Sequence, residues 1–318
     1  MSIPYQDSSQ KQRIQPVEDD GANSIRLSIL LVNYNGIRYL VPCLESIFQF
    51  APPGTQVILE DNASTDGSLE TIETNFPQVE IVRSDRNLGF AGGNNLAGEK
   101  ANGKFILLLN VDTVLLEPIA AAVDWLEEHS TWGALTINMV DGADESAACT
   151  GKFPSPLRFV LLRSMLVRPG QYQGATAYDV DWVQGSFLLM RGDLWKRLNG
   201  LDERYFMYAE DVDLCKRIQK SGYKCGYLPH LRYLHWGGFE TMRFPDQIRG
   251  LATYARTQMS RPQWLISWGI LFVGCILRAI VYYLNWRVGR RDVDLAKAIA
   301  SRNALRALIQ RKPIRPTN

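Results

Sequence analysis

Five consecutive large apolar residues, Phe105–Leu109, end abruptly at Asn110 and Asp112. A run without polar positions is typical of a strand that is buried on both faces, as in a parallel sheet covered by helices. Ligands of open α/β sheets bind at the carboxyl ends of such strands. Two oxygen ligands there suit Mg²⁺ or Mn²⁺ and leave coordination positions free for a diphosphate. The alternative interpretation is a simple turn before a helix near Pro118.

Strands and helices alternate along the first 110 residues. The expected strands are Leu27–Val32, Gln56–Asp61, Val79–Arg83 and Lys104–Leu109, and the expected helices are Tyr39–Phe50, Ser68–Asn75 and one after Gly92. This repetition predicts an α/β fold with a doubly wound, mostly parallel sheet and Rossmann-like halves. Right-handed crossovers bring all the strand ends to one rim of the sheet.

Beyond Trp132 the pattern changes to short strands with irregular connections. The expected strands are Ala134–Val140, Asp179–Val183, Phe187–Arg191, Lys224–Leu228 and Leu231–Leu234, interrupted by a helix from about Tyr208 to Ser221. They predict a smaller, mixed or antiparallel half. We therefore expect a disordered tail over 1–24, one domain over 25–240 with halves of about 25–131 and 132–240, and a helical segment over 241–318.

Charge is distributed unevenly along the chain, although its formal net value is only +2. The segment from Arg278 to the end is strongly basic, which indicates an anionic partner. A membrane surface fits better than nucleic acid, because no aromatic-interleaved basic fold accompanies it. The five cysteines form no CxxC pair, so reduced thiols in the cytosol are expected. The first 24 residues lack the apolar core of a secretory signal.

An apolar run extends from Trp264 to Leu277 and resumes from Ala279 to Leu284. Its length, about 21 residues, is close to what a helix needs to span a bilayer. Aromatic residues near both ends are typical of membrane interfaces. The run therefore predicts a membrane-associating helix, with a buried core helix of the domain as the alternative.

Polar side chains follow the first two expected strands. Asn33, Tyr34 and Asn35 follow the first, and Asp61 and Asn62 follow the second. A carboxylate such as Asp61 can accept the imide N–H of uracil or thymine. Tyr34 and the neighbouring backbone are candidates for contacts with base or ribose.

A glycine-rich segment runs from Arg86 to Asn95 and includes Asn94. Glycines permit a close approach of the backbone to a ligand, and a helix N-terminus together with Arg86 favours phosphate. We expect this segment to be a loop that leads into the helix after Gly92.

Three carboxylates, Glu210, Asp211 and Asp213, stand within four residues at an expected helix start. A helix N-terminus stabilises negative charge, but capping needs only one of them. The apolar spacing that follows lets Asp211 point back at the rim. His235 follows a short strand, and it is either a metal ligand or a structural histidine.

Together these motifs resemble the family 2 glycosyltransferases, which are inverting enzymes with the GT-A fold, from about Leu27 to Gly238. The resemblance implies that the first half binds a nucleotide-sugar donor and that the second binds the acceptor. Asn110-Val111-Asp112 occupies the position of the family's metal-binding DxD motif, with Asn in place of the first Asp. Asp211, in the family's Glu-Asp pair, is the implied general base, and Glu210 is expected to orient it.

The site residues predicted on this basis fall into four groups. The donor-binding residues are Asn33, Tyr34, Asn35, Asp61, Asn62, Arg86, Asn94, Asn110 and Asp112; the acceptor-binding residues are Trp182, Gly185 and Asp213; the catalytic residues are Asp211 and Glu210; and the metal ligands are Asp112 and His235, for Mg²⁺ or Mn²⁺. The segment from Trp182 to Arg191 looks most like the bacterial rhamnosyltransferase branch.

The resemblance predicts transfer of a sugar, rhamnose in the first instance, from a dTDP- or UDP-sugar to a glycan or a polyprenyl-diphosphate-linked saccharide in cell-envelope polysaccharide synthesis. The enzyme is expected at the cytoplasmic face of the plasma membrane. One span with a cytoplasmic C-terminus would put the domain outside, so an in-plane or re-entrant helix is expected.

Two other functions are compatible with a similar sheet. A sugar-1-phosphate nucleotidyltransferase is expected to have a glycine-rich signature with a basic residue after the first strand, where this chain has Asn33-Tyr34-Asn35-Gly36. A non-catalytic glycan-binding protein is expected to lack Asp112 or Asp211, and both are present.

Overall fold

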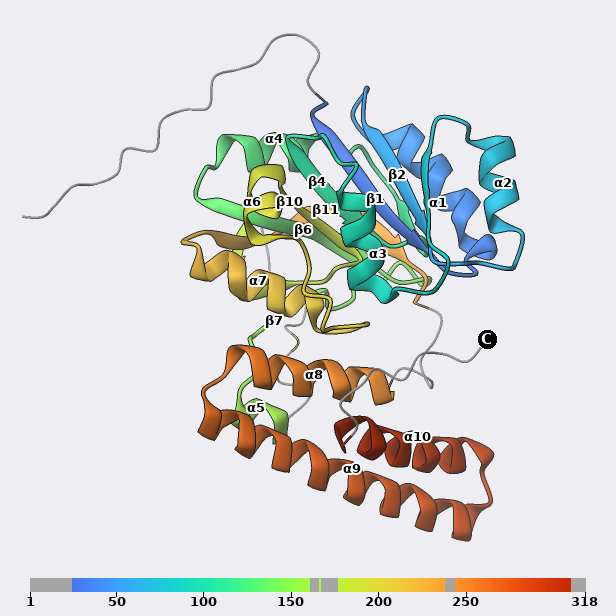
Figure 1. The fold of residues 1–318 in the computed structure, drawn as a ribbon, viewed down its shortest axis with the longest axis vertical. Helices are drawn as coiled ribbons and strands as arrows, with labels where there is room; N and C mark the ends of the chain where they lie inside the picture. The colour runs from blue at the N-terminus through green and yellow to red at the C-terminus, as the bar shows by residue number, and fades with distance from the viewer. Residues whose placement is uncertain (1–24, 161–165, 167–176, 238–243, 310–318) are drawn as a thin grey trace, which may run out of the picture.

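The computed structural model describes residues 25–160, 166, 177–237 and 244–309 (Figure 1). The tail predicted over 1–24 lies outside the described residues. A mixed sheet with helices on both faces forms the upper part of Figure 1, and a layer of long helices lies below it.

One nine-stranded sheet organises the domain, and its main path has the order β3-β2-β1-β4-β10-β6-β11-β5. Its strands are β1 (Leu27–Asn33), β2 (Gln56–Asp61), β3 (Glu80–Arg83), β4 (Phe105–Leu109), β5 (Thr113–Leu115), β6 (Trp132–Val140), β8 (Tyr178–Val180), which pairs with β11 off this path, β10 (Phe187–Arg191) and β11 (Lys224–His235). The four strands β3, β2, β1 and β4 are parallel, and β10 runs antiparallel between β4 and β6. The predicted α/β class with a largely parallel sheet is confirmed. The strands of both predicted halves hydrogen-bond within this one sheet.

Helices connect and cover these strands. They are α1 (Ile37–Phe50), α2 (Ser68–Asn75), α3 (Gly89–Gly98), α4 (Ala120–Glu128), α5 (Pro156–Val160), α6 (Gly192–Leu198), α7 (Glu210–Lys220), α8 (Phe244–Gln258), α9 (Arg261–Gly289) and α10 (Asp292–Ile309). A second, two-stranded sheet pairs β7 (Thr150–Gly151) with β9 (Trp182–Val183).

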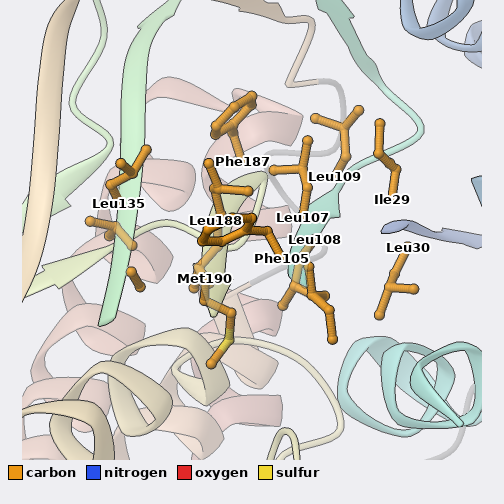
Figure 2. Packing of buried hydrophobic residues seen from close by; sticks show 14 of the residues in the cluster. Ile29, Leu30, Phe105, Leu107, Leu108, Leu109, Leu135, Phe187, Leu188 and Met190 are labelled. Atoms are coloured by element: carbon orange, nitrogen blue, oxygen red, sulfur yellow. The ribbon is translucent and has the colours of Figure 1, made fainter. Parts of the chain in front are cut away.

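The hydrophobic core is centred on β4, whose five side chains are all buried. Leu108 pairs with Leu30 of β1 on one side and with Leu188 of β10 on the other (Figure 2). Truncation of such a leucine to alanine typically costs about 2–5 kcal/mol. The apolar run at Phe105–Leu109 is thus the doubly covered strand that its composition predicts.

Four expected elements, one helix and three strands, differ in detail. Helix α3 begins at Gly89 rather than after Gly92, because the Leu88 backbone N–H donates to Asn62 Oδ1 (2.8 Å) and so fixes the first turn earlier. The two strands predicted at 224–228 and 231–234 are one strand, β11, with a register shift between Leu228 and Arg232.

The strand predicted over Asp179–Val183 is divided between the two sheets, since β8 pairs with β11 and β9 pairs with β7. Strand β5 was not predicted. It has only three residues and forms because Thr113 pairs with His235 at the end of β11.

Helix α9 is the outermost layer of the molecule in Figure 1, and α8 and α10 pack along one side of it. Its buried residues, Ser267, Leu271 and Cys275, follow a helical spacing and form a single stripe. Only 17% of its most apolar 18-residue window is buried. In this structure the apolar run is therefore one continuous helix with an exposed apolar face, which favours the predicted membrane-associating helix over a core helix.

The five cysteines are all free and buried, as the absence of paired motifs predicts. Burial raises the pKa of the Cys43 thiol to about 12, so this side chain behaves as a small apolar group.

Glu60 is a buried carboxyl on β2 that packs against Gly93 of α3. Neither of its oxygens accepts a hydrogen bond within the described part of the chain. Burial, with a smaller contribution from the charge of Asp61, raises its pKa to about 8. The side chain is therefore protonated in the folded protein at neutral pH.

This raised pKa predicts a pH-dependent stability. The pKa of a glutamate in the unfolded chain is about 4.3. Between about pH 5 and 8 the unfolded chain has lost this proton while the folded protein keeps it, so the free energy of unfolding falls by on the order of 1 kcal/mol per pH unit as the pH rises. Glu60→Gln should remove this fall. Urea unfolding at pH 6 and pH 8 checks it, and equal slopes for the wild type and the variant would contradict the assignment.

Candidate active site

The carboxyl ends of β1 and β2 lie side by side, with Asn33 opposite Asp61. Asn33 Nδ2 donates to Asp61 Oδ1 (3.0 Å) and to Ser68 Oγ (2.8 Å), while Asp61 Oδ2 accepts from the Ser64 backbone N–H (3.1 Å). These bonds fix the turn after β2 to the end of β1. Asn33 is buried with its amide satisfied, so it shapes the rim rather than offering a free contact to a donor.

Two more of the predicted donor-binding residues have structural roles. Asn62 is buried and holds the start of α3 through Leu88 and Gly89. Asn94 is buried within α3 and donates to the Phe90 carbonyl oxygen (2.9 Å). Both amides have a structural role, because buried polar groups need hydrogen-bond partners and the partners of these two are backbone groups.

Other predicted donor-binding residues are at the surface. Tyr34, Asn35 and Arg86 are exposed, and Asn35 has a left-handed backbone (φ of 53°). Asn35 Oδ1 accepts from the Thr65 backbone N–H (2.8 Å), which joins the loops after β1 and β2. The Tyr34 ring and the Arg86 guanidinium thus remain available to a ligand at this rim.

Asp112 and His235 meet at the ends of β4 and β11. His235 Nε2 lies 3.2 Å from Asp112 Oδ1, and both side chains are largely buried. The Trp236 backbone N–H also donates to the Asp112 carbonyl oxygen (3.0 Å). The structure therefore brings together the two residues that the sequence predicts as metal ligands, although they are 123 positions apart.

This pair fits a divalent cation that completes its coordination with ligand oxygens. Within the described residues no group of three or more His, Cys, Asp or Glu side chains could hold a metal. One carboxylate and one imidazole leave several positions of an octahedral ion free, as Mg²⁺ and Mn²⁺ sites on diphosphates require.

Asp211 lies in the first turn of α7 and is held by the loop before β10. The Gly185 backbone N–H donates to Asp211 Oδ2 (2.9 Å), and the Val212 N–H donates to Oδ1 (2.7 Å). The next residue of the loop, Ser186, accepts from the Asn110 backbone N–H (3.1 Å). A single loop therefore links the carboxylate of Asp211 to the segment that carries Asp112.

The two adjacent carboxyls of α7 differ in their surroundings. Burial raises the pKa of Asp211, and the N–H groups of Gly185 and Val212 counteract this rise. Burial and the charge of Asp211 raise the pKa of Glu210 well above its usual range, and Glu210 Oε2 has no partner in the described structure. Of the two carboxyls, Glu210 is the one whose charged form is more strongly disfavoured, and Asp211 is the one whose charged form two N–H donors from neighbouring residues favour. Burial, and not the charge of the neighbouring carboxyls, is the cause of the raised pKa of Asp211.

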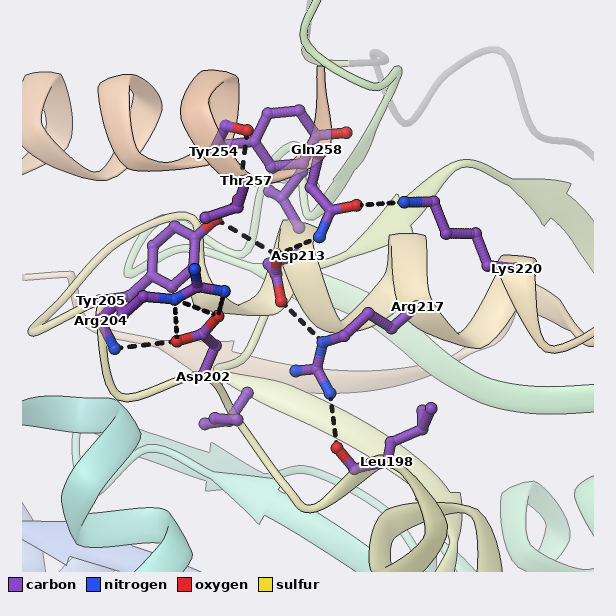
Figure 3. Close-up of polar contacts among 12 residues, drawn as sticks. Leu198, Asp202, Arg204, Tyr205, Asp213, Arg217, Lys220, Tyr254, Thr257 and Gln258 are labelled. Carbon is purple, nitrogen blue, oxygen red and sulfur yellow. Dashed lines mark hydrogen bonds and ion pairs between the residues drawn. The ribbon is translucent and has the colours of Figure 1, made fainter. Parts of the chain in front are cut away.

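Asp213 was predicted to bind an acceptor, and the structure gives it a structural role instead. Its side chain has no exposed surface. Oδ2 accepts from Arg217 Nε (2.7 Å), and Oδ1 accepts from Gln258 Nε2 (2.6 Å) and the Tyr205 hydroxyl (3.2 Å), as Figure 3 shows. A fully buried and saturated carboxylate cannot contact a substrate in this conformation.

Trp182 is also mostly buried, and its Nε1 donates to the Lys152 carbonyl oxygen (3.1 Å). It supports the small β7–β9 sheet. Gly185, the other predicted acceptor residue, contributes its backbone N–H to Asp211, and the Phe90 ring packs against it.

Helix α8 lies within the helical segment predicted over 241–318, but the sequence interpretation missed its contacts with the start of α7. Ile248, Leu251, Ala252 and Ala255 have the spacing of one apolar helix face, which was a usable signal for the helix. No local signal identifies Gln258 as the partner of Asp213, because 45 residues separate them.

The role of Asp213 predicts a loss of stability without a direct effect on a substrate. Asp213→Asn leaves the Arg217 guanidinium with a neutral partner in the interior. Breaking a buried pair in this way costs about 3–5 kcal/mol. Urea unfolding should therefore show a lower midpoint, and an unchanged midpoint would restore the prediction of a ligand-binding role.

Comparison with known proteins gives this arrangement a context. The sequence profile described as Glycosyl transferase family 2 matches residues 28–147. An N-acetylglucosaminyl-diphospho-decaprenol L-rhamnosyltransferase of Mycobacterium tuberculosis is 29% identical over 242 residues, which cover 69% of this chain and 78% of the relative. Rhamnosyltransferase WbbL of Escherichia coli is 28% identical over 228 residues, or 68% and 85% of the two chains.

Solved structures share the fold at low sequence identity. Mannosyltransferase PcManGT from Pyrobaculum calidifontis, in complex with GDP-Man and Mn²⁺, has a TM-score of 0.55 at 16% identity and covers 94% of this chain and 90% of its own. GalNAc-T7 with UDP, GalNAc and Mn²⁺ has a TM-score of 0.57 at 15% identity over 74% of this chain, which spans only about half (51%) of GalNAc-T7. With the profile match, the sheet topology and these neighbours, the chain carries a family 2 glycosyltransferase domain on a GT-A fold.

Proposed function

We propose that this glycosyltransferase moves rhamnose, with inversion, from a dTDP- or UDP-linked donor to a saccharide on a lipid diphosphate at the inner face of the plasma membrane, in cell-envelope polysaccharide synthesis. One observation carries the catalytic part of the proposal. The loop at 184–186 hydrogen-bonds both to the Asp211 carboxylate and to Asn110, two residues before Asp112. A base therefore lies beside the segment proposed to hold the donor.

The sugar and the acceptor come from the relatives. The proteins from M. tuberculosis and E. coli are both named rhamnosyltransferases, and the former is named for a diphospho-decaprenol-linked N-acetylglucosamine. Their alignments cover more than two thirds of this chain and of the relatives. This supports rhamnose as the sugar and a lipid-linked diphospho-saccharide as the acceptor class.

In the proposed reaction, Asp211 Oδ accepts the proton of an acceptor hydroxyl as the hydroxyl oxygen attacks the anomeric carbon of the donor. The bond from that carbon to the nucleoside diphosphate breaks on the opposite face. General-base catalysis of this kind contributes about 10²–10⁴-fold to the rate. Burial disfavours the charged form of Glu210 more strongly than that of Asp211, which makes Asp211 the better base of the pair, and the Gly185 N–H donates to its Oδ2 (2.9 Å).

Asp112 and His235 are the proposed metal ligands. These two side chains would hold a divalent cation, whose charge would offset that of the leaving diphosphate. The exposed Tyr34 and Arg86 are proposed to contact the nucleoside and the phosphates. Asp61 is proposed to accept the imide N–H of the base, while Asn33 Nδ2 donates a hydrogen bond to its Oδ1.

The two alternative functions have less support. A nucleotidyltransferase needs a basic residue after the first strand, and this chain has Asn33-Tyr34-Asn35 there. A non-catalytic binding protein has no need of a partly buried carboxylate that accepts hydrogen bonds from two backbone N–H groups. The division into a donor half over about 25–131 and an acceptor half over about 132–240 stays part of the proposal.

Helix α9 is proposed to lie in the membrane interface. Its exposed side chains are mostly large and apolar, and they include Leu265, Ile266, Val273, Leu277, Ile280, Val281, Tyr283, Leu284 and Val288. Arg287, Arg290 and Arg291 follow at its end, and each cation near an anionic surface contributes roughly 1 kcal/mol. The Arg278 guanidinium stacks on Phe244 and Tyr282, toward the protein, so this charge does not face the lipid.

A donor and acceptor panel tests the function. The purified full-length protein with Mn²⁺ is offered dTDP-rhamnose, UDP-sugars and GDP-sugars, together with an N-acetylglucosaminyl diphosphate on a short polyprenyl chain. Rhamnose transfer from the dTDP donor is expected, and EDTA or Asp112→Asn should nearly abolish it, because an amide is a poor ligand for a hard dication. Mass spectrometry of the product identifies the sugar. Transfer from GDP-sugars alone, or full activity in EDTA, would refute the donor or the metal assignment.

Asp211→Asn should lower kcat by about 10²–10⁴-fold while the donor Kd stays the same. The acidic limb of the wild-type kcat profile should lie above the ordinary aspartate value of about 3.9, because burial raises the pKa of Asp211 and the base is active only when deprotonated. Weaker donor binding by the variant, measured by calorimetry, would place Asp211 in the nucleotide site instead.

The membrane assignment predicts a charge-sensitive face. Leu277→Glu with Val281→Glu puts two anions on the exposed side of α9 without touching its buried stripe. The variant should no longer sediment with vesicles of phosphatidylglycerol, whereas Ser301→Ala on α10 should sediment like the wild type. Equal sedimentation of all three proteins would show that this face does not meet the lipid.

A further inference from the structure

Helix α8 makes an unusually close contact with the residues that precede α7. A Cβ added to Gly250 of α8 would lie 2.1 Å from the Tyr208 carbonyl oxygen and 3.4 Å from Ala209 Cβ. Only glycine permits this approach of one backbone to another. The first turn of α7, with Glu210 and Asp211, begins at the next residue of the chain.

The contacted residues have a strained backbone. Tyr208 and Ala209 are consecutive non-glycine residues with left-handed φ values of 71° and 69°. Such residues cost about 1–3 kcal/mol each and persist only where the surrounding structure holds them. The contact with Gly250 is one element that holds them, because it fixes the carbonyl group between the two strained positions.

A polar network joins the same helices one turn further on (Figure 3). Gln258 of α8 donates to Asp213 Oδ1 (2.6 Å), and the hydroxyls of Thr257 and Tyr205 lie 2.8 Å apart. On the solvent side, Lys220 Nζ donates to Gln258 Oε1 (2.7 Å), an exposed hydrogen bond. Helix α8 therefore contacts the start of α7 at two places, the Tyr208–Ala209 turn before it and the Asp213 side chain within it.

These contacts determine where the Asp211 carboxylate points. Asp211 lies between the two positions that α8 contacts. The Gly185 N–H that donates to its carboxylate belongs to a different segment, the loop before β10. A shift of α7 along its axis by a fraction of its 5.4 Å pitch would break this 2.9 Å bond. The alignment of the carboxylate thus depends on the position of α8.

We propose that α8 is the element that positions the catalytic base, with Gly250 and Gln258 as positioning residues that act through the Tyr208–Ala209 turn and through Asp213. This rests on the proposed role of Asp211 as base. The opposite face of α8 packs on α9, where Ile248 and Ala255 share a cluster with Leu271 and Cys275. Helix α8 therefore connects α9, which has the exposed apolar face, to the proposed base. An acceptor at the membrane surface would then meet a base whose position depends on the helices that bind that membrane.

The first test is Gly250→Ala with Gly274→Ala as its matched control. Both replace a helical glycine by alanine, but a Cβ at Gly274 has nothing within 4 Å. Gly250→Ala should lower kcat by about 10- to 100-fold, since small misplacements of a catalytic group have effects of this size. The KM for the donor should not change, and Gly274→Ala should have wild-type kinetics.

The pH profile separates positioning from a general loss of structure. The Gly185 N–H stabilises the charged form of Asp211, beside the carboxyls of Glu210 and Asp213 on α7. Losing that bond raises the pKa of the base, so the acidic limb of the kcat profile should move to higher pH in Gly250→Ala. A variant that is merely less stable loses active protein but keeps the wild-type limb.

A second pair of variants covers the case in which Gly250→Ala fails to fold. Gln258→Leu removes one donor from Asp213, and Lys220→Ala removes only the exposed partner of the same amide. Gln258→Leu should show the same fall in kcat and the same shift of the limb, and Lys220→Ala should show neither. Hydrogen exchange of the peptide that covers 205–213 should be faster in Gln258→Leu, a readout that needs no activity.

The outcomes are distinct. If Gln258→Leu and folded Gly250→Ala keep the wild-type kcat, pH profile and exchange rate, α8 does not position the base. If exchange accelerates in both while transfer and its pH profile stay unchanged, α8 holds α7 without affecting Asp211, and the inference is equally refuted. A wild-type protein that transfers no sugar from any donor refutes the proposed function, while the exchange experiment still tests the contact.

Discussion

The buried carboxylate of Asp213 is the interaction on which the arrangement around the site depends. Removing a charge from water costs several kcal/mol, and only good partners compensate for it. The partners come from three segments, namely Arg217 of α7, Tyr205 of the preceding loop and Gln258 of α8. Because all must converge on one carboxylate, α7, the loop before it and α8 have one mutual position.

Sheet topology explains how two distant motifs become one site. Strand β10 runs antiparallel to β4, so the residues before β10 lie where β4 ends. This puts Gly185 and Ser186 beside Asn110, and the same short loop then reaches Asp211. A parallel strand in that place would bring its carboxyl end to the rim instead and would move the loop to the far edge of the sheet.

The carboxyls of the site differ through their surroundings rather than their chemistry. Asp211 accepts two backbone N–H bonds, whereas neither Glu60 nor the Oε2 of Glu210 has a partner in the described structure. Burial raises the pKa of all three. Asp211 accepts hydrogen bonds from the backbone N–H groups of Gly185 and Val212, which favour its charged form, whereas Glu210 has only its own backbone N–H as such a donor. This difference suits the role of base that we propose for Asp211, since a base must keep its charge in a partly dry environment.

The sequence by itself determined the strands, the fold class and the candidates. The apolar run at Phe105–Leu109 and the polar residues that end it were visible because burial on both faces of a strand leaves an uninterrupted apolar run in the chain. Only the tertiary structure decided which polar residues face the site: Asn62, Asn94 and Asp213 turned inward, whereas Asp112 met His235. The physical reason is that a buried polar group is satisfied by whichever partner the fold brings to it. For Asp213 that partner is Gln258, on a helix 45 residues away that no local pattern connects to it.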